Sequence, residues 1–191
     1  MGIKEGITAK KVIKIFIICL IVGFILFVFA IIQTVKTKST NISKKAPYKE
    51  VLGKELVTKR PIRLFMEQTP TKKEYPYAMS DTNQTFWKSY TAMLQADEPV
   101  IKLSDSVETN AKVVFDKAVM YTNGVSGSSN PRLFGTLTSA DGKTYKVEFL
   151  WGTYDYNYPW KVSQRGYLFE LAPWQTVKDT THYYLPNAEW W

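Results

Sequence analysis

The chain of 191 residues has little of what builds covalent or metal-bound frameworks, since it contains one cysteine and one histidine. A single Cys excludes an intramolecular disulfide framework and a cysteine-based zinc site, and a single His excludes a histidine-rich metal centre. The phosphate-binding motifs G-x-x-x-x-G-K-[ST] and G-x-G-x-x-G are missing, and no G-x-S-x-G elbow accompanies His182. We therefore expect a protein that is not an enzyme and that uses no metal or other cofactor.

Long apolar runs are also scarce, and the exception lies near the N-terminus. Residues 15–32 read IFIICLIVGFILFVFAII and contain no charged side chain. The stretch between Lys14 and Lys36 would form a helix of about 31 Å, which matches a bilayer core of about 30 Å. A cleaved signal peptide is the alternative, but its apolar region runs only about 7–15 residues and ends in small residues. The pattern predicts an uncleaved transmembrane helix over residues 15–35.

The excess of positive charge does not belong to the C-terminal part of the chain. The whole chain carries 25 Lys and Arg against 17 Asp and Glu, for a net charge of +8. Residues 61–191 hold 13 Lys and Arg against 14 Asp and Glu, which gives −1, so residues 1–60 hold the remaining +9. A nearly neutral domain has no basic stripe to neutralise phosphates, which argues against nucleic acid as a partner.

Basic side chains instead flank the apolar segment, where they either contact anionic lipid headgroups or are simply solvated. They are Lys10, Lys11, Lys14, Lys36, Lys38, Lys44 and Lys45. A short positive segment before a first apolar helix favours an N-terminus that stays in the cytoplasm. The chain would then consist of a cytoplasmic N-terminus (1–14), the transmembrane helix (15–35), a basic tether (36–45) and an extracytoplasmic domain (46–191), periplasmic in a bacterium.

The extracytoplasmic part is expected to be a small α+β domain. Apolar residues recur at the spacing of one helix face in two places. They are Tyr48, Val51, Leu52 and Leu56 in the first, and Phe86, Trp87, Tyr90, Met93 and Leu94 in the second. After Pro99 the apolar period shortens towards two, and Asp141-Gly142 predicts a hairpin turn between two strands. We expect an antiparallel β-meander packed against one or two helices.

The densest aromatic run lies between two of the predicted strands. Its members are Trp151, Tyr154, Tyr156, Tyr158 and Trp160. Tyrosines at alternating positions point to one side of an extended chain, here the tip of a hairpin. If exposed, they would form a recognition surface, because Tyr and Trp bury large areas at low entropic cost. If buried, they complete the core of the domain. The run is therefore a candidate partner-binding site with core packing as its alternative.

The order of these features resembles that of a known family. The chain resembles the single-pass cytochrome oxidase assembly proteins in the order of its segments. These are an N-terminal apolar segment, a helix ending near Leu52-Gly53, and strands through Phe134-Gly135, Asp141–Val147 and Trp160–Val162. The resemblance implies a small domain held outside the inner membrane. It assigns no functional residue.

These features together predict a non-enzymatic single-pass membrane protein that contacts lipid through residues 15–35. Its exported domain would bind another membrane or exported protein, as an assembly or scaffolding subunit of a membrane complex. An immunity or inhibitor protein that neutralises an exported toxin or hydrolase is the alternative. Cys19 and Gly23 form a small-xxx-small pair in the apolar segment, which allows helix association and a homo-oligomer.

Overall fold

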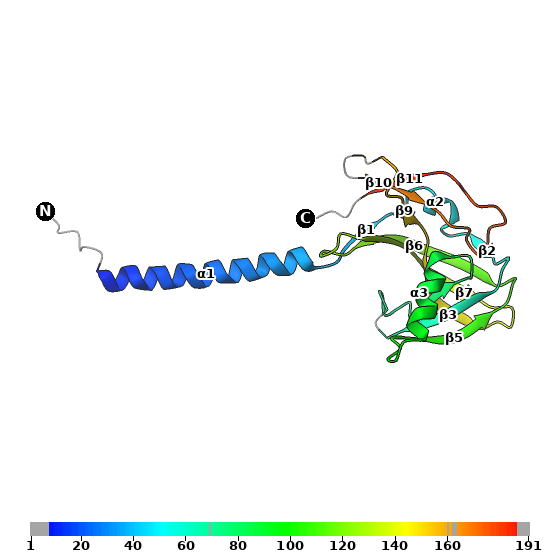
Figure 1. Ribbon diagram of the computed structural model, residues 1–191, viewed down its shortest axis with the longest axis horizontal. Coiled ribbons are helices and arrows are strands. Elements are labelled where there is room, and N and C mark those ends of the chain that lie inside the picture. Colours follow the sequence, from blue (N-terminus) through cyan, green and yellow to red (C-terminus); the bar gives the residue numbers. More distant parts are fainter. Residues whose placement is uncertain (1–7, 69, 160, 162–163, 187–191) are drawn as a thin grey trace.

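The computed structural model describes residues 8–68, 70–159, 161 and 164–186 of the chain. Figure 1 shows the helix α1 (Ala9–Val35) standing apart from a mostly β domain. None of its residues is buried against the protein, and within the described residues it is the one helix long and apolar enough to cross a membrane. The helix contains the whole of the predicted segment 15–35 and extends it towards the N-terminus.

The described residues after α1 form two β-sheets and two short helices. The strands are β1 (Lys38–Asn41), β2 (Glu55–Val57), β3 (Ile62–Glu67), β4 (Tyr77–Ser80), β5 (Ile101–Val107), β6 (Lys112–Thr122), β7 (Ser129–Thr138), β8 (Thr144–Leu150), β9 (Thr153–Tyr154), β10 (Gln164–Leu168) and β11 (Tyr183–Pro186). The short helices are α2 (Tyr48–Val51) and α3 (Thr85–Leu94).

The larger sheet is mixed, so the expected antiparallel meander is only partly correct. Its eight strands follow the order β1-β6-β7-β8-β4-β3-β5, with β2 also pairing β6. Strands β6, β7 and β8 form a meander, but β4 runs parallel to β8, with Tyr77 beside Val147. The β3–β4 pair, which precedes the meander in the sequence, thus lies next to its last strand, β8. Alternation of apolar residues identifies strands but not their partners, and for this reason the sequence does not reveal the insertion.

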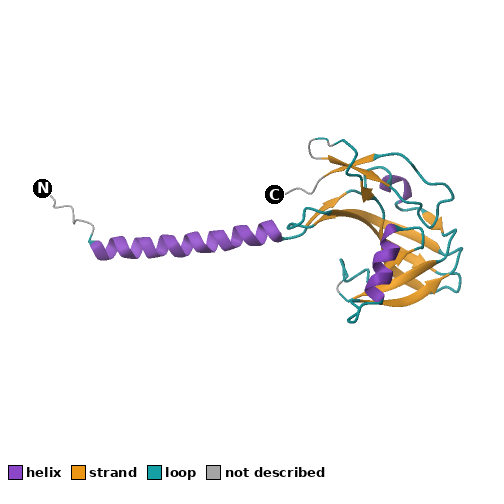
Figure 2. Ribbon diagram, in the orientation of Figure 1, coloured by secondary structure: helices purple, strands orange, loops and turns teal. Residues whose placement is uncertain are grey.

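The main core lies between the large sheet and a smaller sheet of order β11-β10-β9, with α2 beside it (Figure 2). Val147 and Phe149 of β8 are fully buried there. Tyr48 of α2 and Tyr167 of β10 are buried against the same face. Helix α2 is shorter than expected, because Leu56 belongs to β2 and pairs with Val113 instead of continuing the helix.

Helix α3 covers the opposite face of the sheet over β3, β4 and β5. Tyr90 of the helix stacks on Phe65 of β3, with ring centroids 4.8 Å apart. The predicted second helix is thereby confirmed, although it begins at Thr85 and leaves Met93 41% exposed. The Asp-Gly hairpin between β7 and β8 is confirmed as well, with Gly142 at a φ of 84°.

Strand β1 replaces much of the expected tether over 36–45. Only Lys36 and Thr37 separate it from α1, and it pairs with β6 along its whole length, with Ser39 beside Tyr121. Its sequence is polar because it is the edge strand of the sheet among the described residues, and apolar alternation is weak at a sheet edge. The sequence therefore reads as a linker where the structure has a strand.

The end of α1 also contacts the turn between β6 and β7. A Cβ atom on Gly124 would lie 2.4 Å from the carbonyl oxygen of Thr34 and 2.7 Å from that of Lys36. Only glycine permits this approach, because backbone atoms cannot move aside. The ammonium group of Lys38 also donates a hydrogen bond to the carbonyl oxygen of Gln33. Helix and sheet are therefore held together at several points.

Candidate functional site

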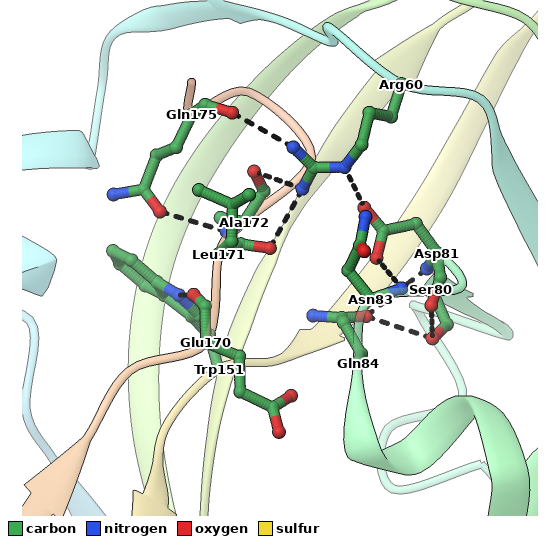
Figure 3. Close-up of polar contacts among 10 residues, drawn as sticks. All are labelled: Arg60, Ser80, Asp81, Asn83, Gln84, Trp151, Glu170, Leu171, Ala172 and Gln175. Carbon is green, nitrogen blue, oxygen red and sulfur yellow. Dashed lines mark hydrogen bonds and ion pairs between the residues drawn. The ribbon is translucent and has the colours of Figure 1, made fainter. Parts of the chain in front are cut away.

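The aromatic run is divided between the core and the surface. Trp151 is 2% exposed, and its indole N–H donates a 3.0 Å hydrogen bond to the carbonyl oxygen of Glu170 (Figure 3). Its ring packs edge-on against Phe169 and Trp174, with centroids 4.9 and 5.4 Å away. Trp151 is a core residue, since a ring buried in this way does not reach a partner. Trp160 lies outside the described residues.

The tyrosines of the run occupy a surface turn instead of an extended tip. The backbone N–H of Tyr158 donates to the carbonyl oxygen of Asp155, which bends the chain inside the run. The ring of Tyr154 lies 4.5 Å from that of Tyr156, whereas Tyr158 stacks on His182 at 4.0 Å. The expected one-sided row of tyrosines is wrong, because alternating residues share a side only where the backbone is extended.

Tyr156 is the most accessible member of this aromatic turn (Tyr154–Tyr158), with 83% of its surface exposed. A groove of about 150 Å³ lies beside it, and Tyr154, Arg165 and Phe86 contribute to its lining. The guanidinium of Arg165 lies 5.3 Å from the centre of the Tyr154 ring. An exposed ring next to a groove lined by aromatic and arginine side chains has the composition of protein-binding surfaces.

The single histidine ties the aromatic turn to the segment before β11. Nε2 of His182 lies 2.9 Å from Oδ2 of Asp155, while its ring stacks on Tyr158. This hydrogen bond holds the pKa of the Asp155 carboxyl below its usual value. The contacts give His182 a role in positioning the turn.

The basic residues that flank the apolar segment follow the helix and its junction with the sheet. Lys10, Lys11 and Lys14 are exposed on α1, Lys36 is exposed directly after it, Lys38 lies half-buried in β1, and Lys44 and Lys45 are exposed after β1. Each exposed ammonium group is therefore free to reach solvent or a lipid surface.

A largely buried arginine holds the segment 171–175, which we call the C-terminal segment, on the domain (Figure 3). Nε of Arg60 lies 2.8 Å from the carboxylate of Asp81, whose side chain is 1% exposed. The terminal nitrogens of Arg60 donate to the carbonyl oxygens of Leu171, Ala172 and Gln175 at 2.8 to 3.0 Å. The other carboxylate oxygen of Asp81 accepts a backbone N–H at 2.9 Å. We call this group the Arg60 clamp; its charges are bonded by the chain itself, which indicates a structural role.

A second polar region lies at the end of the domain next to α1. Strand register places Ser39, Tyr121 and Asn130 side by side on β1, β6 and β7. They line a cavity of about 410 Å³, which we call the helix-proximal pocket. The other lining residues are Thr37, Thr71, Asn123 and Arg132. The pocket is therefore built mainly from uncharged hydrogen-bonding side chains.

Arg132 alone is charged among the residues that line this pocket, and it is paired with the carboxylate of Glu148. Glu148 is 2% exposed, and within the described part of the chain its Oε2 has no hydrogen-bond partner. Burial raises the pKa of Glu148 to about 7, an effect that Arg132 opposes and Glu67 reinforces. Burial also raises the pKa of Glu67. The ion pair beside the pocket is thus sensitive to pH near neutrality.

In the sequence, Glu148 alternates with the apolar residues Val147 and Phe149, a pattern typical of the solvent-facing side of a strand, so it gives no signal for this region. The structure buries Glu148 where the β3–β4 connection folds over the sheet, with the ring of Tyr75 5.1 Å from that of Phe134. The Asp-Gly hairpin could have revealed the pair. Its register puts Arg132 and Glu148 diagonally on one face of β7 and β8.

Comparison of the chain with protein-family models, curated proteins and solved structures finds no match. The resemblance to cytochrome oxidase assembly proteins therefore stays a prediction. Within the residues that the structure describes, no group of three or more His, Cys, Asp or Glu is placed to hold a metal ion. The geometry of the aromatic turn and of the helix-proximal pocket is what bears on function.

Proposed function

We propose that the chain is a single-pass membrane protein whose β domain binds another protein through the aromatic turn, as an assembly or scaffolding subunit of a membrane complex. The observation that carries the proposal is the 83% exposure of Tyr156 beside a groove lined by Tyr154 and Arg165. A tyrosine ring exposed to this degree contributes nothing to the core, and Tyr and Arg are the residues that most often dominate binding energy at protein interfaces.

Helix α1 supports the membrane anchor by its length and composition. Its short basic N-terminal flank favours a cytoplasmic N-terminus, which would export the β domain to the periplasm of a bacterium. The lysines around the helix would then contact anionic headgroups at either side of the bilayer. Lipid is thus the first partner of the chain, through residues 15–35.

The junction between α1 and the sheet favours a partner in the same membrane over a captured soluble toxin. Lys36 and Thr37 alone connect the helix to β1, and Gly124 packs against the helix end. The aromatic turn is therefore held at a fixed height above the bilayer. A partner anchored in the same membrane also holds its surface at a fixed height. The two surfaces then meet by diffusion within the plane of the membrane alone.

Site-specific photo-crosslinking in intact membranes tests this function. A benzophenone amino acid at position 156 is expected to give one discrete protein adduct. The matched control places the same amino acid at position 177, where Val177 is 78% exposed outside the aromatic turn. The adduct at position 156 should disappear when Tyr154 is also changed to Ser.

Identical adducts at positions 156 and 177, or none at position 156, would refute the aromatic turn as the binding site. A partner that is soluble and unattached to membranes would support the inhibitor alternative instead. Protease protection gives the topology. We expect protease to digest the β domain only after the outer envelope is opened. Protection of the β domain in right-side-out inner-membrane vesicles, whose cytoplasmic face is inside, would contradict export.

A further inference from the structure

The helix-proximal pocket gathers polar side chains, and several of them have no hydrogen-bond partner among the described residues. Thr37, Ser39, Tyr121 and Asn130 line it, and none of their side chains forms a hydrogen bond within the described part of the chain. Asn123 differs, since its carboxamide oxygen accepts the backbone N–H groups of residues 125 and 126 at 2.8 and 2.9 Å. Hydroxyl and carboxamide groups both donate and accept hydrogen bonds. Their convergence on one cavity offers a ligand several bonds at once.

The charge around the pocket disfavours an ionic ligand. The guanidinium of Arg132 is already bonded to the carboxyl of Glu148, and the carboxyl of Glu67 acts on the same pair. An anion would have to displace Glu148 and leave a buried carboxyl without its counter-ion, which is costly. An apolar ligand fits no better, because it would cover hydrogen-bonding groups without replacing their bonds to water.

We propose that the helix-proximal pocket binds an uncharged polyhydroxylated ligand, a saccharide, through Ser39, Tyr121 and Asn130. These residues form one row across β1, β6 and β7, so a sugar ring laid along the row meets each of them. The ring of Tyr121 is half-buried, so it adds apolar surface to the row beside its hydroxyl group. The cavity of about 410 Å³ lies within the range of about 300–1,000 Å³ that small-molecule sites occupy.

The ligand has two possible sources with the same chemistry. Thr37 lines the pocket and lies two residues after the last residue of α1, so the pocket would lie close to the membrane surface. A glycolipid headgroup reaches this position from the bilayer, and a free oligosaccharide reaches it from solution. Both present the same hydroxyl groups to the row of Ser39, Tyr121 and Asn130.

The full chain in detergent micelles is tested by saturation-transfer NMR against maltose, cellobiose, lactose and N,N′-diacetylchitobiose, with inorganic phosphate as the charged probe. Binding of the full chain in nanodiscs to phosphatidylcholine vesicles with and without monoglucosyl diacylglycerol tests the lipid source. Asn130→Ala and Ser39→Ala should each weaken sugar binding about threefold to tenfold, as expected for loss of a hydrogen bond. Asn157→Ala and Ser104→Ala, which alter exposed residues that do not line the pocket, are the matched controls.

Binding of a soluble sugar that the pocket variants weaken and the controls do not would support the proposal with a free saccharide as ligand. Binding only to the glycolipid vesicles, with the same dependence on Asn130 and Ser39, would support the headgroup. Failure of every sugar and of the glycolipid overturns the proposal. So does binding of phosphate in place of sugar, or an equal effect of pocket and control variants.

Discussion

Two arginines of the domain each pair with a deeply buried carboxylate, yet their surroundings differ. Arg60 contacts Asp81 and also the backbone carbonyl oxygens of Leu171, Ala172 and Gln175. Arg132 contacts Glu148, lines an open polar cavity and leaves one carboxylate oxygen of Glu148 unbonded in the described part of the chain. The first arrangement is closed upon itself, whereas the second borders an open cavity and contains a buried carboxylate oxygen that is not fully bonded.

The difference separates a structural ion pair from a candidate binding site. A buried ion pair stabilises a fold only when its remaining donors and acceptors are also bonded, because desolvation otherwise outweighs the attraction. The Arg60 clamp meets this condition with backbone carbonyls that no ligand displaces. At Arg132 the condition is unmet, and such incompletely bonded buried groups concentrate at functional sites.

The largest expected effect is on the Arg60 clamp. Arg60→Leu leaves Asp81 buried without its counter-ion and removes the donors to the C-terminal segment, so the free energy of unfolding should fall by about 3–5 kcal/mol. Urea unfolding of the full chain in micelles, followed by tryptophan fluorescence, measures this. Arg63→Leu is the control, because the half-buried Arg63 lines a pocket together with Arg60 and Asp81, and its replacement should cost about 1 kcal/mol or less. Equal losses would contradict the structural role of the clamp.

A second prediction concerns the pH dependence of stability. The pKa of Glu148 rises from 4.5 to about 7 on folding, so the folded chain keeps a proton that the unfolded chain releases. The free energy of unfolding should therefore fall as pH rises from about 4.5 to about 7, by of the order of 3 kcal/mol. Glu148→Gln should remove most of this decline, with Glu67 responsible for the remainder.

Urea unfolding at a series of pH values checks the slope. The exposed Glu98→Gln variant is the control and should keep the full decline. Arg132, Glu67, Tyr90 and Tyr121 interact electrostatically with Glu148 and are unchanged in both variants. An unaltered slope in Glu148→Gln would show that this carboxyl is ionised alike in the folded and unfolded chain.

A smaller effect is expected for Arg132→Gln, and it should depend on pH. Above neutrality the variant leaves the Glu148 carboxylate without a cation, which should lower the free energy of unfolding by about 1–3 kcal/mol. At pH 5 Glu148 holds its proton and the loss should nearly vanish. The double variant with Glu148→Gln completes a mutant cycle whose interaction energy reports the pair. If the free energy of unfolding falls equally at both pH values, the Arg132–Glu148 pair is a structural ion pair like that of Arg60 and Asp81.

The smallest effect is predicted where α1 meets the helix-proximal pocket. The Cβ of Gly124→Ala would press on the carbonyl oxygen of Thr34, at a local cost of about 1 kcal/mol. Amide hydrogen exchange of residues 36–39 should accelerate roughly fivefold, while exchange in β7 and β8 stays unchanged. Val125→Ala, at the adjacent position with 78% exposure, is the control. Unchanged exchange at the junction would mean that Gly124 does not hold the helix end.

The sequence predicts those parts of the fold in which local pattern suffices. The apolar run of α1, the face of Phe86 and Tyr90 on α3 and the Asp141-Gly142 turn all follow from spacing within a few residues. The position of β4 beside β8 and the strand β1 depend on distant partners, which spacing does not encode. These elements are therefore visible only in the folded chain.

The candidate sites divide in the same way. An aromatic cluster is evident from composition, but its division into a buried Trp151 and an exposed Tyr156 depends on the bend at Asp155. The helix-proximal pocket escapes prediction because its residues come from β1, β6, β7 and three connections. Its members are common polar residues, and only the register of three strands gives them a shared position.

The direct connection between α1 and β1 links the orientation of the β domain, as well as its distance from the helix, to the position of α1. With Lys36 and Thr37 as the entire connection and Gly124 packed on the helix end, rotation of the β domain relative to the helix is restricted. Rotation of α1 about its long axis would therefore move the exposed Tyr156 around the same axis. Such a rotation is expected when two of these helices associate or when α1 changes its neighbouring helix. If α1 spans a membrane as proposed, its contacts within the lipid would thus decide the direction in which the aromatic turn (Tyr154–Tyr158) faces.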